Sequence, residues 1–298
     1  MEPAIFTGLG TAIITPFHLD ESVDHASLKQ LVEMQIAGGA DFLVACGSTG
    51  EASTLTADET DAVIATVIEA AAGRIPVMAG CTHNSTREAV ARAQRMAKIA
   101  GLSGILTANP YYNKPTQQGQ YLHFKAIADA VAPIPVLLYN IPGRTAANLL
   151  PETVLRLAEL PNIIGIKESS GNLAQIGELL AIKPADFAVF SGDDYLALPI
   201  IASGGVGLIS VASNVAPKEV KAVMTAALSG NREAACAAAK KVRALNTALF
   251  AEPNPAPTKA LLAEMKAIAG DTLRLPMLPV GENTRAQLRD IAAALHLL

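Results

Sequence analysis

The sequence predicts an α/β fold, a (β/α)8 barrel followed by a C-terminal helical extension. Short apolar runs alternate with amphipathic helical patterns, and this unit recurs roughly every 25 to 35 residues. Eight such runs are present, and they are apolar throughout, as parallel strands are when both faces of the sheet are covered. The alternative is a doubly wound open sheet. No GxGxxG motif follows the first strand, which argues against the dinucleotide-binding version of that fold.

The predicted strands are short and bounded by Gly, Pro or polar turn residues. Because only 4% of the chain is aromatic and Trp is absent, Ala, Ile, Val and Leu must fill the core. The eight predicted strands are residues 8–15, 42–47, 76–81, 104–108, 135–140, 163–167, 187–191 and 205–210.

Helical patterns lie between these strands. Thr56 followed three residues later by Glu59 is the signature of a capping box, and it predicts a helix start there. Pro151 and Pro217 suit the first turn of a helix. The helices expected within the barrel include residues 24–37, 57–72, 86–100, 117–131 and 151–160.

More helical patterns follow the eighth strand than a barrel needs. They cover residues 218–228, 232–249, 258–268 and 284–294, and a proline-rich break at 253–257 interrupts them. We therefore expect residues 1–217 to form the barrel and residues 218–298 to form a helical extension packed on it.

Composition and charge limit the classes of partner. The chain of 298 residues is 51% hydrophobic with a net charge of −4, which gives no case for a nucleic-acid or anionic-membrane partner. Cys46, Cys81 and Cys236 show no CxxC spacing and fit a reduced compartment better than a disulfide framework. Neither a signal-peptide pattern nor an apolar run of about 18 residues is present. We expect a cytoplasmic protein without membrane contact.

Lys167 ends the predicted sixth strand and is the most informative residue of the chain. A lysine in a buried apolar strand is costly unless it is paired or used. Burial disfavours the ammonium, and a neutral amine can attack a carbonyl to form a Schiff base. A buried ion pair, for instance with Glu168, is the other interpretation.

Polar residues stand at the predicted carboxyl ends of other strands, where barrel active sites form. Ser48 and Thr49 lie in a Gly-rich turn whose amides and hydroxyls suit an anion such as a carboxylate. Tyr139 can pass protons, and Arg144, on the loop beyond it, can grip a carboxylate. Taken singly, each has an ordinary structural interpretation: a βα turn, a core tyrosine, a solvated arginine.

The seventh and eighth strands contribute Gly192 and Ile209, which we include as candidate substrate-binding residues. Asp193 and Asp194 follow Gly192, and we expect them to cap the next helix rather than to bind a cation.

Other chemistries find little support. The five histidines are scattered without HxH or HExxH spacing, so no metal site is expected. The sequence contains no GxSxG motif, the pattern that would indicate a serine hydrolase. Cys46 and Cys81 lie in apolar strands and are expected to be inert core residues.

Taken together, these residues resemble the dihydrodipicolinate synthase and N-acetylneuraminate lyase family of class I aldolase-like barrels. The resemblance runs from about residue 6 to the C-terminus. It is carried by Gly-Ser-Thr-Gly-Glu at 47–51, Tyr-Asn-Ile-Pro at 139–142 and Gly-Ile-Lys-Glu at 165–168. Segments 110–115, 142–145, 210–217, 252–255 and 273–277 are typical of the dihydrodipicolinate synthase branch.

The resemblance implies a condensation of pyruvate with L-aspartate 4-semialdehyde to 4-hydroxy-tetrahydrodipicolinate, in lysine and diaminopimelate synthesis. Lys167 is the implied Schiff-base residue. Thr49, Tyr139 and Tyr112 are the implied proton relay, with Tyr112 reaching the site of a neighbouring subunit. Arg144 is implied to hold the carboxylate of the semialdehyde. No metal or organic cofactor is implied.

The resemblance also implies regulation and assembly. Asn84, Glu88 and Tyr111 match residues of the lysine effector pocket, whereas Ala52 and Thr60 replace the Ser and His of many inhibited relatives, so we expect weak or absent inhibition by lysine. A homo-oligomer is expected, a tight dimer within a tetramer that is a dimer of dimers. Adjacent phenols at 111 and 112 cannot easily both enter one barrel mouth, and exposed aromatic residues commonly anchor interfaces.

Two alternatives stay open. One is another pyruvate-dependent class I aldolase, such as a sialic acid or keto-deoxy sugar lyase, although polyol substrates need hydroxyl partners where Arg144 stands. The other is a barrel that binds a keto acid without catalysis, which the joint presence of Lys167, Tyr139 and Thr49 argues against.

Overall fold

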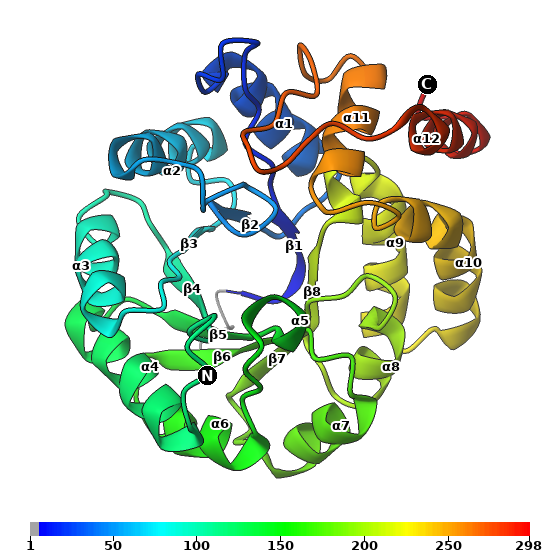
Figure 1. Cartoon of the computed structure of the whole chain (residues 1–298). Helices are drawn as coiled ribbons and strands as arrows, with labels where there is room; N and C mark the ends of the chain where they lie inside the picture. Colours follow the sequence, from blue (N-terminus) through cyan, green and yellow to red (C-terminus); the bar gives the residue numbers. More distant parts are fainter. Residues whose placement is uncertain (1–5) are drawn as a thin grey trace.

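Eight parallel strands close into a barrel in the order β1 to β8, and the helices surround it (Figure 1). The structure is a computed structural model, and it describes residues 6–298. This closed barrel confirms the predicted fold class. The strands are β1 Gly8–Ala12, β2 Phe42–Ala45, β3 Val77–Gly80, β4 Gly104–Ala108, β5 Val136–Asn140, β6 Ile163–Glu168, β7 Ala188–Ser191 and β8 Gly207–Ser210.

The observed helices follow the predicted order and differ mainly at their ends. Those up to residue 228 are α1 His25–Ala37, α2 Ala57–Ala71, α3 Thr86–Met96, α4 Gln117–Val131, α5 Pro142–Thr145, α6 Pro151–Ala158, α7 Leu173–Ile182, α8 Ala197–Ala202 and α9 Pro217–Leu228, with a 3-10 turn, η1, at Ala212–Asn214. The capping box of Thr56 and Glu59 is present at the start of α2, as predicted.

The first strand is shorter than the predicted 8–15. It ends at Ala12, and the amide of Ile13 still donates to the carbonyl of Val44 at 3.1 Å. One residue further on a side chain takes over, since Oδ1 of Asn214 accepts from the amide of Ile14 at 3.1 Å. The chain after β1 is therefore attached to the loop after β8, beside the mouth of the barrel.

Apolar side chains fill the barrel interior. The rings of Phe6 and Phe42, and of Phe42 and Phe190, meet edge to face with centroids 5.3 and 5.6 Å apart. A larger core of Leu, Val, Ile and Ala lies between the strands and the surrounding helices. The polar residues predicted for the site therefore lie at the carboxyl ends of the strands and in the loops that follow them.

A register shift between β5 and β6 decides which way the key lysine faces. Val136 pairs with Ile163, but Leu137 pairs with Gly165, so one residue of β6 is skipped. Beyond this irregularity Tyr139 pairs with Lys167. Because Tyr139 belongs to the interior cluster, its partner Lys167 also faces the interior.

The C-terminal extension lies outside the ring of barrel helices (Figure 1). It comprises α10 Arg232–Ala248, α11 Ala256–Glu264 and α12 Glu282–Ala294. The predicted boundary at residue 217 remains a prediction, since α9 packs both on β1 and on α10. In the part of the chain that the structure describes, no helix is long and apolar enough to cross a membrane.

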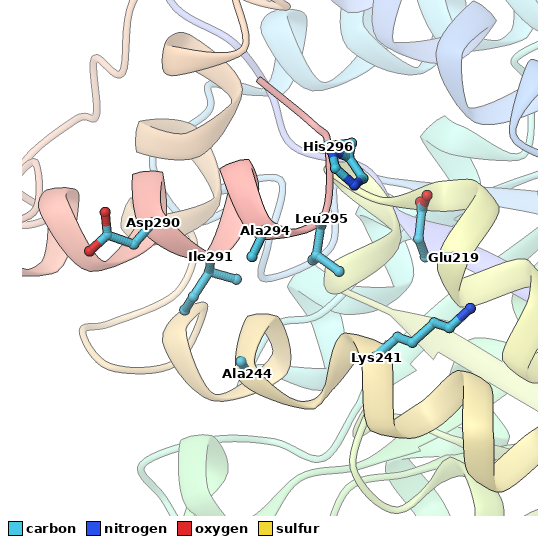
Figure 2. Close-up of a pocket in the computed structure, with 8 residues that line it drawn as sticks. All are labelled: Glu219, Lys241, Ala244, Asp290, Ile291, Ala294, Leu295 and His296. Carbon is cyan, nitrogen blue, oxygen red and sulfur yellow. The ribbon is translucent and has the colours of Figure 1, made fainter.

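A side cavity of about 680 Å³ lies between α9, α10 and α12, away from the strand ends (Figure 2). Ala244, Ile291, Ala294 and Leu295 give it apolar walls, and charged groups stand around it. None of the predicted site residues lines this side cavity.

Candidate active site

A cavity of about 1040 Å³ opens at the carboxyl ends of the strands. Its lining combines strand ends, the loops that follow them and part of the C-terminal extension. Six of the predicted catalytic and substrate-binding residues line it: Ser48, Thr49, Tyr139, Arg144, Lys167 and Gly192.

Lys167 is 6% exposed and faces this cavity. Burial lowers the pKa of its amine from 10.5 to about 8, the carboxylate of Asp194 opposes this and Arg144 reinforces it. Among residues 6–298 no ion pair includes Lys167. The alternative of a pair with Glu168 is wrong, because that carboxylate accepts hydrogen bonds from Asn140 and from the amide of Ser170.

Gly192 makes room for the lysine. A Cβ atom at this position would lie 2.7 Å from Cε of Lys167 and 1.9 Å from Oγ of Ser169, closer than real contacts allow. Its amide donates to the carbonyl of Glu168 at 2.8 Å, which holds β7 beside β6 at this point. A side chain here would displace the lysine.

The expectation that Asp193 and Asp194 cap the next helix is wrong for both residues. Helix α8 begins only at Ala197, and no side chain caps it. The carboxylate of Asp194 instead accepts hydrogen bonds from the Ser210 hydroxyl and the amide of Val211, the latter at 3.0 Å. Asp194 therefore joins the ends of β7 and β8, and it is a negative charge close enough to affect Lys167.

Tyr139 lies beside Lys167 and is 7% exposed. Burial raises the pKa of its phenol to about 12, and the guanidinium of Arg144 and the hydroxyl of Ser169 oppose this shift. The phenol is therefore protonated at neutral pH, and it suits the donation and return of a proton rather than the role of a fixed anion.

The turn at Ser48 and Thr49 has the features of an anion seat. The amides of Gly50 and Glu51 donate to the carbonyls of Gly47 and Ser48, at 3.0 and 3.2 Å. The amides of Ser48 and Thr49 have no acceptor among residues 6–298 and lie at the cavity. The N-terminus of α2 does not contribute to this turn, because the helix starts only at Ala57. Two free amides and the hydroxyls remain for a carboxylate.

Arg144 lies in the short helix α5, which follows β5. Its Nη2 donates to the main-chain carbonyl of Asn254 at 3.4 Å, and its other donors have no partner within residues 6–298, so they can bind a ligand. The cavity lining thus combines the amine of Lys167, the hydroxyls of Thr49 and Tyr139, the free amides of Ser48 and Thr49, and the guanidinium of Arg144. That set can bind a small keto acid and a second carboxylate.

The model of the Dihydrodipicolinate synthetase family matches residues 5–295. The chain belongs to this family. It is 55% identical over 291 residues to 4-hydroxy-tetrahydrodipicolinate synthase of Koribacter versatilis, covering 98% of this chain and 96% of the relative. The relative of the same name from Acidobacterium capsulatum is also 55% identical, with 98% and 96% covered.

Among solved structures, the chloride-inhibited dihydrodipicolinate synthase of Acinetobacter baumannii complexed with pyruvate is 42% identical, with a TM-score of 0.94 and 98% and 99% of the two chains covered. The resemblance read from the motifs is therefore confirmed at the level of the family.

The sequence analysis missed Asn254 as a site residue. This residue lies in the C-terminal extension. It precedes α11, is 6% exposed and lines the cavity. Its Nδ2 donates to Oγ1 of Thr49 at 2.9 Å, across 205 residues of sequence. No local sequence pattern predicts such a contact. The proline residues around Asn254 indicate only a break between helices.

Lys259 is a second buried lysine that the sequence analysis missed. Its side chain is fully buried, pairs with the carboxylate of Glu51 and donates to the carbonyl of Thr272 at 2.9 Å. Burial lowers the pKa of this amine as well. Lys259 does not line the cavity, so it does not face a substrate. It instead attaches the extension to the loop between β2 and α2, residues 46–56, which contains Ser48 and Thr49 and is called the anion-seat loop below.

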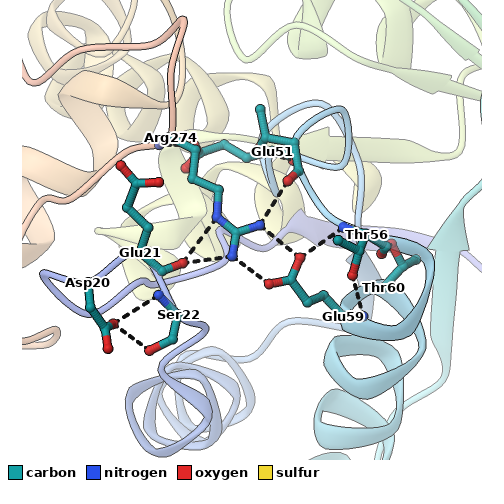
Figure 3. Close-up of polar contacts among 9 residues, drawn as sticks. Asp20, Glu21, Ser22, Glu51, Thr56, Glu59, Thr60 and Arg274 are labelled. Atoms are coloured by element: carbon teal, nitrogen blue, oxygen red, sulfur yellow. Dashed lines mark hydrogen bonds and ion pairs between the residues drawn. The ribbon is translucent and has the colours of Figure 1, made fainter.

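Arg274 attaches the extension to the start of α2 (Figure 3). Its Nη2 donates to Glu59 at 2.6 Å and to the carbonyl of Glu21 at 2.7 Å, and its Nη1 donates to the carbonyl of Thr54 at 2.8 Å. Hydrogen bonds from Arg274 lower the pKa of Glu59 to about 2. The anion-seat loop is therefore held by the extension at Thr49, Glu51 and Thr54.

Two of the three predicted effector residues line the same cavity. Glu88 and Tyr111 line it together with Ala52 and Thr60. Asn84 lies outside the lining, and its main-chain carbonyl accepts from Asn113 at 2.9 Å. Catalytic and effector candidates thus share one recess.

Tyr112 and Ile209 lie outside the cavity lining. Tyr112 is 85% exposed and has a φ of 73°, a conformation that non-glycine residues seldom adopt. It does not pack on its own chain as a loop tyrosine usually does. Ile209 is fully buried in the interior cluster with Tyr139, so its expected contact with substrate remains a prediction.

In residues 6–298 no group of three or more His, Cys, Asp or Glu side chains is arranged to hold a metal ion. Cys46 and Cys81 are buried, as expected, and burial raises the pKa of each thiol to about 12. Neither is suited to act as a nucleophile at neutral pH.

Proposed function

We propose that the protein condenses pyruvate with L-aspartate 4-semialdehyde to 4-hydroxy-tetrahydrodipicolinate in lysine and diaminopimelate synthesis. Its relatives that are 55% identical over nearly the whole chain carry the name of this synthase. The observation that supports the proposal most directly is the unpaired Lys167 amine at the cavity, beside Tyr139 and the free amides of Ser48 and Thr49.

Lys167 acts as the nucleophile. Its neutral amine attacks the keto carbon of pyruvate, and the adduct loses one water molecule to give an imine. A methyl proton is then lost, and the resulting enamine forms a carbon–carbon bond with the aldehyde carbon of the second substrate. The amino group of that substrate finally attacks the imine carbon, which closes the ring and releases the Lys167 amine.

The remaining residues bind substrates and move protons. The amides of Ser48 and Thr49 hold the pyruvate carboxylate, and Gly192 lets the methyl end lie against Lys167. Thr49 and Tyr139 carry the protons that the imine steps release and need. Arg144 holds the carboxylate of the semialdehyde, because its free donors can form a paired contact with two oxygens.

The working unit is a homo-oligomer, a tight dimer within a tetramer, in the cytoplasm. Tyr112 supports this assembly because its side chain is exposed and lies outside the lining of its own cavity. An exposed aromatic side chain held in a left-handed backbone conformation suits insertion into the site of a second copy.

The test is a coupled assay of the purified protein with pyruvate and L-aspartate 4-semialdehyde, run beside N-acetylneuraminate and a keto-deoxy sugar acid. Turnover of the semialdehyde at a kcat/KM at least about 100-fold above that of the sugar acids is the expected result. Preference for a sugar acid would instead support a lyase, the alternative function in this family.

A further inference from the structure

Asn254 contacts two of the proposed site residues at once, from a part of the chain that is not in the barrel. We propose that Asn254 is a positioning residue, which sets the direction of the hydrogen bond made by the Thr49 hydroxyl and so keeps its proton available to the reaction. This inference rests on the proposed function, in which Thr49 transfers protons.

The direction of the bond follows from the donor. Nδ2 of Asn254 donates to Oγ1 of Thr49 at 2.9 Å, so the threonine oxygen acts as acceptor in this contact. A hydroxyl has one proton and two lone pairs. With one lone pair occupied by the amide, the Thr49 proton is directed to another acceptor, and the cavity that both residues line supplies it in the form of substrate or Tyr139.

The amide cannot easily turn over. Oδ1 of Asn254 is buried and has no hydrogen-bond partner within residues 6–298. A reversed amide would place its NH2 group, with two donors, in that unpartnered position, while Oδ1 would take the Thr49 proton. The observed orientation leaves Oδ1 and one N–H of Nδ2 without a partner within residues 6–298, whereas the reversed amide leaves both N–H groups without one. An unpaired buried N–H is rarer than an unpaired carbonyl oxygen, so the observed orientation is favoured.

The position of Asn254 is fixed by its neighbours. The amide of Lys259 donates to the carbonyl of Pro255 at 3.0 Å in the first turn of α11, and the Lys259 side chain is buried against Glu51, two residues after Thr49. The main-chain carbonyl of Asn254 also accepts from Arg144 at 3.4 Å. One residue of the extension therefore contacts both the pyruvate side and the semialdehyde side of the site.

The experiment is a double-mutant cycle between Asn254→Ala and Thr49→Val, with kcat and both KM values measured. Asn254→Ala is expected to lower kcat about 10- to 100-fold and to change the KM for pyruvate by less than about threefold. On the Thr49→Val background the same substitution is expected to lower kcat by less than about twofold, since the hydroxyl that it acts through is gone.

Asn254→Asp sharpens the test. The carboxylate has nearly the same shape but only accepts hydrogen bonds, so it takes the Thr49 proton that the amide leaves free. We expect kcat to fall at least as far as in Asn254→Ala. The ratio of the kcat of Asn254→Asp to that of the parent at the same pH is expected to rise below about pH 5, where a carboxyl group is protonated and can donate again.

Asn246→Ala is the matched control. Asn246 is also a buried asparagine of the extension whose Oδ1 has no partner within residues 6–298, but it does not line the cavity. The kcat of Asn246→Ala should therefore stay within about twofold of that of the parent. Equal losses of kcat from Asn254→Ala with Thr49 and with Val at position 49 would overturn the inference. Absence of turnover in the parent protein would instead overturn the proposed function.

Discussion

Tyr139 and Lys167 are register partners on β5 and β6, and Nζ of Lys167 lies 4.4 Å from the centroid of the Tyr139 ring. A ring face attracts a cation, which favours the ammonium form of the lysine. Burial acts in the opposite direction and prevails, because the pKa of Lys167 still falls to about 8. The pair thus places an amine that is readily deprotonated against a phenol that stays protonated.

Trapping of the imine will identify the reactive lysine. Incubation with pyruvate and borohydride should add one pyruvate-derived mass per chain, and peptide mapping should place it on Lys167. Lys259 is also buried but lies outside the cavity lining, so it should stay unlabelled. A label that persists in Lys167→Ala would show that another amine reacts.

Imine formation should depend on pH with an apparent pKa of about 8. The folded-state pKa of Lys167 is lowered, so the neutral amine accumulates as the pH rises through that value. The initial rate of trapping should therefore increase from about pH 6 and level off above about pH 9. A rate that keeps rising toward pH 10.5, the ordinary pKa of a lysine, would contradict the effect of burial.

Arg144→Ala should weaken use of the second substrate and leave pyruvate binding largely intact. The loss of a charged hydrogen-bond pair is expected to lower kcat/KM for the semialdehyde by about 10- to 1000-fold. Arg87→Ala, which removes a side chain that is 91% exposed on α3, is the control. If imine formation falls as far as turnover, Arg144 serves pyruvate binding or folding instead.

Inhibition by lysine should be weak or absent. Ala52 and Thr60 line the cavity and supply neither the serine hydroxyl nor the imidazole of many inhibited relatives. Calorimetric titration with L-lysine should show no submillimolar binding, and the double variant Ala52→Ser with Thr60→His should bind more tightly. Submillimolar binding together with inhibition of the parent protein would show this prediction to be wrong.

Mixing of subunits tests the role of Tyr112. Inactive Tyr112→Phe chains and inactive Lys167→Ala chains are combined under conditions in which subunits exchange. Activity should return, because some dimers then hold an intact Lys167 facing an intact Tyr112 of the other copy. Exchange shown by mass spectrometry, with no return of activity, would place the whole site within one subunit.

The barrel and most of its site could be predicted because their signals are local. An apolar run marks each strand, the capping box marks the start of α2, and a lysine among isoleucines stands out by its cost. Asp194 was misassigned because a carboxylate shortly before a helical pattern is typical of a cap, whereas here its partners lie on the loop after β8.

The contribution of the extension could not be predicted, because its contacts join residues that lie far apart in the sequence. Lys259 lies in an amphipathic pattern where lysines are usually solvated, and its partner Glu51 is in the first quarter of the chain. Asn254 finds Thr49 across 205 residues. One sequence without related sequences to compare contains no signal for contacts at that distance.

The attachment of the anion-seat loop to the extension has a consequence for protein synthesis. The loop leaves the ribosome early, but Asn254, Lys259 and Arg274 follow much later. Until then a buried Glu51 would be an uncompensated negative charge, so the nascent barrel must keep this loop in water. The newly made chain thus becomes able to bind its keto acid only when its last quarter docks, and fragments that stop short of it should be inert even where the barrel has formed.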